Sequence, residues 1–107
     1  MEGADVLLVP AAFNMTTGPM HWELMFRSQA VNNQVFAIGT APAREKGSSY
    51  LSWGHSIVAD PWGKVVQMDE KPGIQITELN LKLLEEVRQQ LPLMKHRRTD
   101  IYTLKKN

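Results

Sequence analysis

The chain has 107 residues, of which 43% are hydrophobic and 21% are charged, a composition typical of an ordinary globular protein that forms one domain or part of one. Lys and Arg together number 12, against 11 for Asp and Glu, so no strong electric field favours nucleic acid or an anionic membrane as a partner. The sequence contains no cysteine, which excludes disulfides, thiolate metal ligands and a cysteine nucleophile within these residues.

Neither a leader sequence nor a membrane anchor is indicated. The first residues lack a basic stretch followed by an apolar one, and no uninterrupted apolar run approaches the roughly 18 residues that suggest a membrane helix. We therefore expect a cytoplasmic location and no membrane partner.

A strand, a helix and a second strand are predicted first. The continuous apolar run Val6–Val9 is typical of a strand covered on both faces of a sheet. Such a strand this near the start of the chain lacks neighbours on both sides, which we interpret as a sign that the chain is part of a larger domain. Val35–Thr40 is again mostly apolar and follows the helix directly, so the three elements predict a βαβ unit.

The helix between these strands is expected over about Pro19–Asn33. Hydroxyl residues and a glycine precede it, and Pro19 suits its first turn. Trp22, Phe26 and Ala30 recur every fourth residue, an arrangement that predicts a face packed on a sheet. Leu24 and Met25 widen this apolar stripe.

The second half of the chain predicts a loop, three short strands and a helix. The polar stretch Pro42–Ser49 is expected to be an exposed and mobile loop. Ser56–Asp60 and Lys64–Met68 are separated by Pro-Trp-Gly, which favours an antiparallel hairpin. Ile74–Thr77 alternates apolar and polar residues like a third strand. A final helix is expected between Asn80 and Pro92, and the whole order suits a mixed α/β structure.

Two constellations suggest chemistry but favour a structural interpretation. His21, His55 and His96 lack the close spacing of metal-ligand pairs, so we expect no metal site. His55, Ser56 and Asp60 resemble the composition of a Ser-His-Asp triad, yet adjacent strand residues point to opposite faces, which prevents the hydroxyl and the imidazole from sharing a proton.

A basic cluster lies near the end of the chain, at Lys95, His96, Arg97 and Arg98. Nucleic-acid binding through such a cluster usually comes with aromatic stacking residues or a basic excess over the whole domain. Neither accompanies it here, so we expect a solvated or ion-paired tail and no nucleic-acid partner.

The loop Pro10–Gly18 differs because it leaves the carboxyl end of a buried strand and enters a helix N-terminus, an edge where ligands of α/β sheets bind. Phe13 could wall an apolar pocket, while Asn14, Thr16, Thr17 and the helix amides could hold a carboxylate or another anion. A well-capped helix with no ligand explains the same residues, and the loop alone leaves both interpretations open.

Several segments resemble nitrilase-superfamily amidases in order and spacing. They are the run from Val9 to Glu23, Trp53-Gly54-His55-Ser56, the Asp60-Pro61-Trp62-Gly63 turn, Glu85 to Gln90 and the ending Arg97 to Tyr102. Phe-Asn-Met-Thr-Thr-Gly-Pro and Arg-Arg-Thr-Asp-Ile-Tyr resemble the omega-amidase branch in particular. The resemblance covers nearly the whole chain and implies that residues 1–107 are the C-terminal part of one carbon-nitrogen hydrolase domain, an incomplete α-β-β-α four-layer sandwich.

The resemblance also implies an activity for a full-length parent. In that family a cysteine attacks an amide carbonyl, a glutamate acts as the base and a lysine stabilises the oxyanion. For the omega-amidase branch the implied substrates are small keto-acid amides, alpha-ketoglutaramate and alpha-ketosuccinamate, and no cofactor is expected. Homo-oligomers are also implied for the parent.

The resemblance places all three catalytic residues upstream of the matched segment, so we expect no catalytic residue in this chain and no activity from it alone. Phe13 and Thr17 occupy family positions that look toward the bound keto acid, and we expect them to bind substrate. The alternative is a non-catalytic interaction protein that docks onto full-length subunits of the family.

Overall fold

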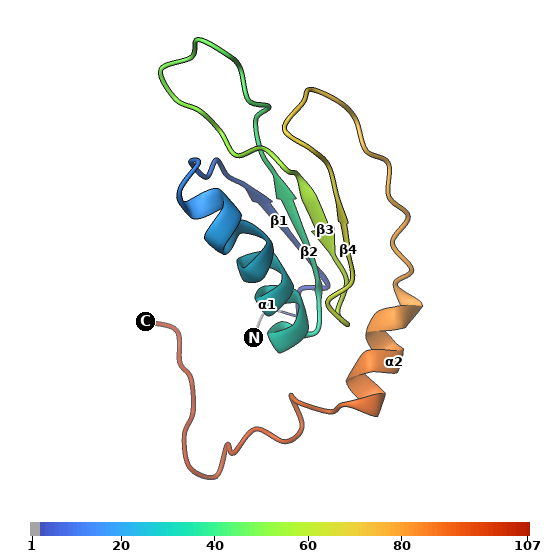
Figure 1. Cartoon of the computed structure of the whole chain (residues 1–107). Coiled ribbons are helices and arrows are strands. Elements are labelled where there is room, and N and C mark those ends of the chain that lie inside the picture. Colours follow the sequence, from blue (N-terminus) through green and yellow to red (C-terminus); the bar gives the residue numbers. More distant parts are fainter. Residues whose placement is uncertain (1–2) are drawn as a thin grey trace.

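Four strands form one mixed sheet in the order β1-β2-β3-β4 (Figure 1). They are β1 (Val6–Pro10), β2 (Phe36–Thr40), β3 (Ile57–Ala59) and β4 (Val65–Gln67). The computed structural model describes residues 3–107. β1 pairs with β2 in parallel, which confirms the βαβ unit, and β3 pairs with both β2 and β4 in an antiparallel manner, which confirms the hairpin.

One helical segment links β1 to β2. It begins as the π-helical turn η1 (Gly18–Trp22) and continues as α1 (Glu23–Asn33). Its expected inner face is confirmed, because the exposed fractions of Trp22, Phe26 and Ala30 are 0%, 6% and 0%. The expected widening of that stripe is wrong, because Leu24 is 62% exposed and Met25 is 49% exposed. The helix instead meets the hairpin turn on its other flank, where Arg27 donates to the carbonyl oxygen of Gly63 at 2.9 Å.

Small residues on the sheet allow α1 to lie close to it. A Cβ atom built on Gly39 would stand 2.4 Å from Cζ of Phe26, so the phenyl ring rests directly on the backbone of β2. Ala37 and Ala59 pair across β2 and β3, and both are buried with Ile57 in the core beneath the helix. The core therefore lies between α1 and one face of the sheet.

The opposite face of the sheet carries an aliphatic row that crosses all four strands. Leu8 pairs with Ile38, Ile38 with Val58, and Val58 with Val66, and alternation along each strand places this row away from α1. Leu8 is 73% exposed and Val66 is 44% exposed. Among the described residues β1 is an edge strand and α1 covers only one of its faces. This agrees with the expectation that the chain does not itself supply the neighbours that such an apolar strand needs.

The final helix, α2 (Lys82–Gln90), is confirmed. The side-chain oxygen of Asn80 accepts the N–H of Lys82 at 3.2 Å at its start, and Leu84 and Val87 are 2% and 1% exposed. Gln34, the residue with left-handed backbone angles that ends α1, connects α2 to the end of α1. Its side-chain amide donates to the carbonyl oxygen of Leu91 at 2.6 Å.

The prediction of a third short strand at Ile74–Thr77 is wrong. The segment at 74–77 has no strand in the structure, and Ile74 and Ile76 are 92% and 89% exposed. Alternation of apolar and polar residues predicts a strand only where a neighbouring strand accepts its ladder hydrogen bonds, and β4 ends the sheet of the described residues.

Candidate functional site

Asn14 organises the loop between β1 and the helical segment. Its side-chain oxygen accepts hydrogen bonds from the backbone N–H of Thr16 at 2.9 Å, from that of Thr17 at 2.8 Å and from the hydroxyl of Thr17 at 3.0 Å. Its carbonyl oxygen accepts the N–H of Gly18 at 2.8 Å. Thr17 stands at the N-cap position without a side-chain cap bond, and Asn14 occupies the N–H groups of Thr16, Thr17 and Gly18. Of the two interpretations left open for this loop, these contacts favour a well-capped helix with no anion on its amides.

Phe13 lies on the aromatic end of the core. Its ring meets that of Trp22 edge to face, with centroids 4.9 Å apart, and Trp22 stands 4.6 Å from Phe26. Phe13 is half-buried and lines a cavity of about 150 Å³ whose other lining residues are apolar apart from Gln29. The structure thus fixes the Phe13 ring against the core, five residues before the helical segment begins at Gly18.

The segment Trp53-Gly54-His55 joins this loop from the other side. The N–H of Trp53 donates to the carbonyl oxygen of Phe13 at 2.7 Å, and the Trp53 and His55 rings stack with centroids 4.1 Å apart. His55 has the left-handed φ of 62°, which costs about 1–2 kcal/mol for a residue other than glycine. Its carbonyl oxygen accepts the indole N–H of Trp22 at 2.7 Å, which helps to hold that conformation.

Gly18 is the point of closest approach between the two loops. A Cβ atom there would stand 2.3 Å from Cβ and Cγ of Trp53, so we expect Gly18→Ala to lower the free energy of unfolding by about 1–3 kcal/mol through overpacking. Gly73→Ala is the control, because its Cβ would meet the flexible end of Met68 at 3.2 Å. Urea unfolding of both variants measures the difference, and equal midpoints would contradict this contact.

Arg44 closes the loop that follows β2. Its Nε donates to the carbonyl oxygen of Ser52 at 2.9 Å and its second guanidinium nitrogen donates to that of Trp53 at 3.1 Å. The guanidinium also lies over the Trp53 ring, 5.5 Å from its centroid. The predicted loop is confirmed, but Arg44 is half-buried and anchored rather than fully exposed.

The loops at the carboxyl end of β1 can line a ligand site, but His55, Ser56 and Asp60 do not form a nucleophile paired with a base. Ser56 bonds the backbone N–H of Ala41 at 3.0 Å, while Nδ1 of His55 contacts the carbonyl oxygen of Trp53 at 2.6 Å. Asp60 accepts the backbone N–H groups of its own turn. No group of three His, Cys, Asp or Glu side chains that could hold a metal ion occurs among residues 3–107.

The basic cluster of the tail is partly ion-paired. Arg98 forms a bidentate pair with Asp100, with nitrogen to oxygen distances of 2.9 and 2.7 Å. The Arg98 guanidinium lowers the pKa of Asp100, and the carboxylate raises the pKa of Arg98. No helix of the described residues is long and apolar enough to cross a membrane.

The geometry is shared with solved structures of known class. Nit3 of Saccharomyces cerevisiae, a member of branch 10 of the nitrilase superfamily, is 48% identical, with a TM-score of 0.85 over 90% of this chain and 36% of Nit3. The NitFhit protein of C. elegans is 38% identical, with a TM-score of 0.87 over 94% of this chain and 25% of that one. This α/β structure therefore has the fold of part of a nitrilase-superfamily protein.

Sequence comparison agrees with the fold. The Carbon-nitrogen hydrolase family pattern matches residues 1–89, and omega-amidase NIT2 of Mus musculus is 47% identical over 104 residues, which are 96% of this chain. The chain belongs to the carbon-nitrogen hydrolase family, and it is similar to omega-amidases over almost all its residues. It spans 38% of the length of the mouse protein.

The comparisons confirm the family resemblance read from the motifs, whereas the roles of Phe13 and Thr17 stay predictions. Trp53, His55 and Arg44 were not assigned to the site from sequence. The stack of Trp53 on His55 depends on two consecutive left-handed residues, Gly54 and His55, and only the glycine gives a signal for such a turn in the sequence.

Proposed function

We propose that residues 1–107 are the C-terminal part of an omega-amidase-like carbon-nitrogen hydrolase domain. The observation that carries the proposal is the similarity to proteins named omega-amidase, 47% identical in mouse and 45% in human over 104 residues. The whole enzyme then hydrolyses alpha-ketoglutaramate or alpha-ketosuccinamate to the keto diacid and ammonia, without a cofactor. We further propose that it is a cytoplasmic homo-oligomer.

The proposed reaction proceeds through a cysteine thioester. The thiolate adds to the amide carbonyl carbon, and collapse of the tetrahedral oxyanion breaks the C–N bond as the nitrogen takes a proton and leaves as ammonia. Water, deprotonated by the glutamate, then adds to the thioester and releases the acid and the thiol. Because this sequence has no cysteine, the thiol has to come from residues outside it, and we propose that the chain alone is inactive.

The role proposed for this chain is to form one wall of the substrate site. Phe13, held edge to face against Trp22, offers an apolar surface to the carbon chain of the keto acid and excludes water. The backbone N–H groups of Thr16 and Thr17 are occupied by Asn14, and the role proposed for the Thr17 hydroxyl is to donate to the terminal carboxylate of the substrate. In this structure the Thr17 hydroxyl donates to the side-chain oxygen of Asn14 at 3.0 Å. We expect this hydroxyl to rotate away from Asn14 when the substrate binds.

The wall is tested in a chimera in which this chain replaces the matching segment of mouse omega-amidase. We expect Thr17→Val to raise KM for alpha-ketoglutaramate by about tenfold while kcat changes little, since one hydrogen bond to a charged group is lost in both ground and transition states. Thr16→Val is the matched control, because Thr16 is exposed and bonds Asn14 through its backbone. Equal KM values for the two variants would contradict the assignment of Thr17.

The second candidate function is a non-catalytic protein that docks onto full-length subunits of the family. The aliphatic row on the open face of the sheet favours it, with Leu8 and Val66 exposed and Ile38 and Val58 half-buried between them, because a continuous apolar row often marks an interface. Sedimentation of the purified chain mixed with intact mouse omega-amidase tests it. Co-sedimentation that Leu8→Lys abolishes supports docking, and separate sedimentation of the two proteins contradicts it.

A further inference from the structure

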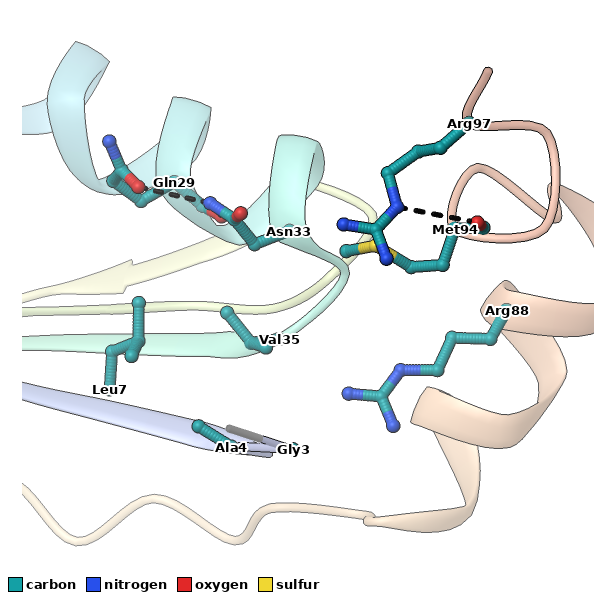
Figure 2. Close-up of a pocket in the computed structure, with 9 residues that line it drawn as sticks. All are labelled: Gly3, Ala4, Leu7, Gln29, Asn33, Val35, Arg88, Met94 and Arg97. Carbon is teal, nitrogen blue, oxygen red and sulfur yellow. Dashed lines mark hydrogen bonds between the residues drawn. The ribbon is translucent and has the colours of Figure 1, made fainter. Parts of the chain in front are cut away.

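A second cavity lies at the opposite end of the sheet from the candidate site. It has a volume of about 600 Å³, within the range of roughly 300–1,000 Å³ found for small-molecule sites. Figure 2 shows that it opens between the start of β1, the end of α1 and the tail that follows α2. Leu7 and Val35 give it an apolar wall, and Gln29 and Asn33 stand at its rim.

Two guanidinium groups lie on the tail side of this cavity, those of Arg88 and Arg97 (Figure 2). Arg88 is held in place, because its Nε donates to the carbonyl oxygen of Gln34 at 3.1 Å and its Nη1 forms an ion pair with Asp5 at 3.0 Å. Arg97 donates to the carbonyl oxygen of Met94 at the long distance of 3.4 Å. Among residues 3–107 no carboxylate forms an ion pair with Arg97, which leaves one uncompensated positive charge at the cavity.

We propose that this cavity binds a small organic carboxylate with an apolar body. A planar guanidinium can bind a carboxylate through two parallel hydrogen bonds. Arg97 donates only through its Nε within the described residues, so its two terminal nitrogens are available to a ligand. Arg88, held by Asp5 and Gln34, places a second guanidinium on the same side, with its charge paired by Asp5. The aliphatic wall of Leu7 and Val35 takes the carbon chain. This site is separate from the proposed amidase site and does not depend on it.

The guanidinium groups, rather than the amide side chains at the rim, are what favour a carboxylate over a neutral polar ligand. The side-chain nitrogen of Asn33 donates to the side-chain oxygen of Gln29 at 3.0 Å and to its carbonyl oxygen at 3.1 Å. Both bonds use the amide nitrogen of Asn33, whereas the amide nitrogen of Gln29 forms no hydrogen bond with the described residues and is also open to a ligand; the charged donors at the cavity are the two guanidinium groups.

The test is calorimetric titration of the purified chain with hexanoate, acetate and 1-hexanol. We expect hexanoate to bind at least about tenfold more tightly than acetate, because its longer chain covers the apolar wall, and 1-hexanol to show no binding. Arg97→Gln should weaken hexanoate binding by about tenfold or more. Arg98→Gln is the control, because Arg98 is paired with Asp100 outside this cavity, and it should bind like the unchanged chain.

Three results would overturn the proposal. Equal binding by Arg97→Gln and Arg98→Gln would show that the charge at position 97 plays no part. Equal affinity for hexanoate and acetate would show that the apolar wall is not used. Circular dichroism without a β-sheet signal would mean that the cavity does not form in this chain, because its walls come from β1, α1 and the tail together.

Discussion

Trp22→Ala is expected to lower the free energy of unfolding by about 3–5 kcal/mol, a range typical of removing a large buried aromatic side chain. Trp22 is fully buried, and its ring joins Phe13 to Phe26 at centroid distances of 4.9 and 4.6 Å. Its indole N–H also donates to the carbonyl oxygen of His55. A loss of this size is a large fraction of the stability of a small domain, which is about 5–15 kcal/mol.

Urea unfolding followed by circular dichroism measures this loss, with two further variants for comparison. Trp22→Phe keeps a ring but leaves the His55 carbonyl oxygen without its donor, so we expect an intermediate cost of about 1–3 kcal/mol. Trp62→Ala is the control, because Trp62 is 47% exposed and should change stability by less than about 1 kcal/mol. Similar losses at positions 22 and 62 would contradict the proposed core.

Arg44→Met is expected to open the loop after β2. Each hydrogen bond from a charged group contributes about 1.5–3 kcal/mol, and Arg44 makes two, to the carbonyl oxygens of Ser52 and Trp53. Its loss also removes the contact with the Trp53 ring. Lysine cannot reproduce the fork of the guanidinium, so Arg44→Lys should recover only part of the stability.

Amide hydrogen exchange measures this effect locally. We expect exchange over residues 41–55 to rise at least about tenfold in Arg44→Met, while exchange within α1 changes little, since the lost bonds join residues of one loop. Lys46→Met is the matched control, because Lys46 is exposed in the same loop. Unchanged exchange in Arg44→Met would show that the loop is closed by other contacts.

Local patterns predicted most of the helices and strands. The spacing of Trp22, Phe26 and Ala30 identified the buried face of the helix, because a period of four residues keeps side chains on one side. The turn around Gly63, which has a φ of 90°, marked the hairpin. The same patterns failed at Leu24 and Met25, because hydrophobic residues are not confined to the interior and the sequence does not reveal which flank of a stripe meets the sheet.

The candidate site was less accessible to sequence analysis because it depends on contacts between distant residues. Phe13 and Thr17 lie in one recognisable loop, whereas Trp53 joins them through a hydrogen bond to the backbone of Phe13. Arg44 was assigned to an exposed loop from its polarity, and its position over Trp53 follows from the fold. Asn14 and Thr17 are both good capping residues, and only the geometry shows that Asn14 accepts the hydrogen bonds.

Ammonia release from alpha-ketoglutaramate tests the central claim most directly. Three samples are compared: this chain alone, the chimera with the rest of mouse omega-amidase, and the chimera with its nucleophilic cysteine replaced by alanine. We predict release by the intact chimera alone, which would show that these residues complete an omega-amidase but cannot act without a thiol from outside. Release by the chain alone, or a folded intact chimera that releases none, would contradict the account.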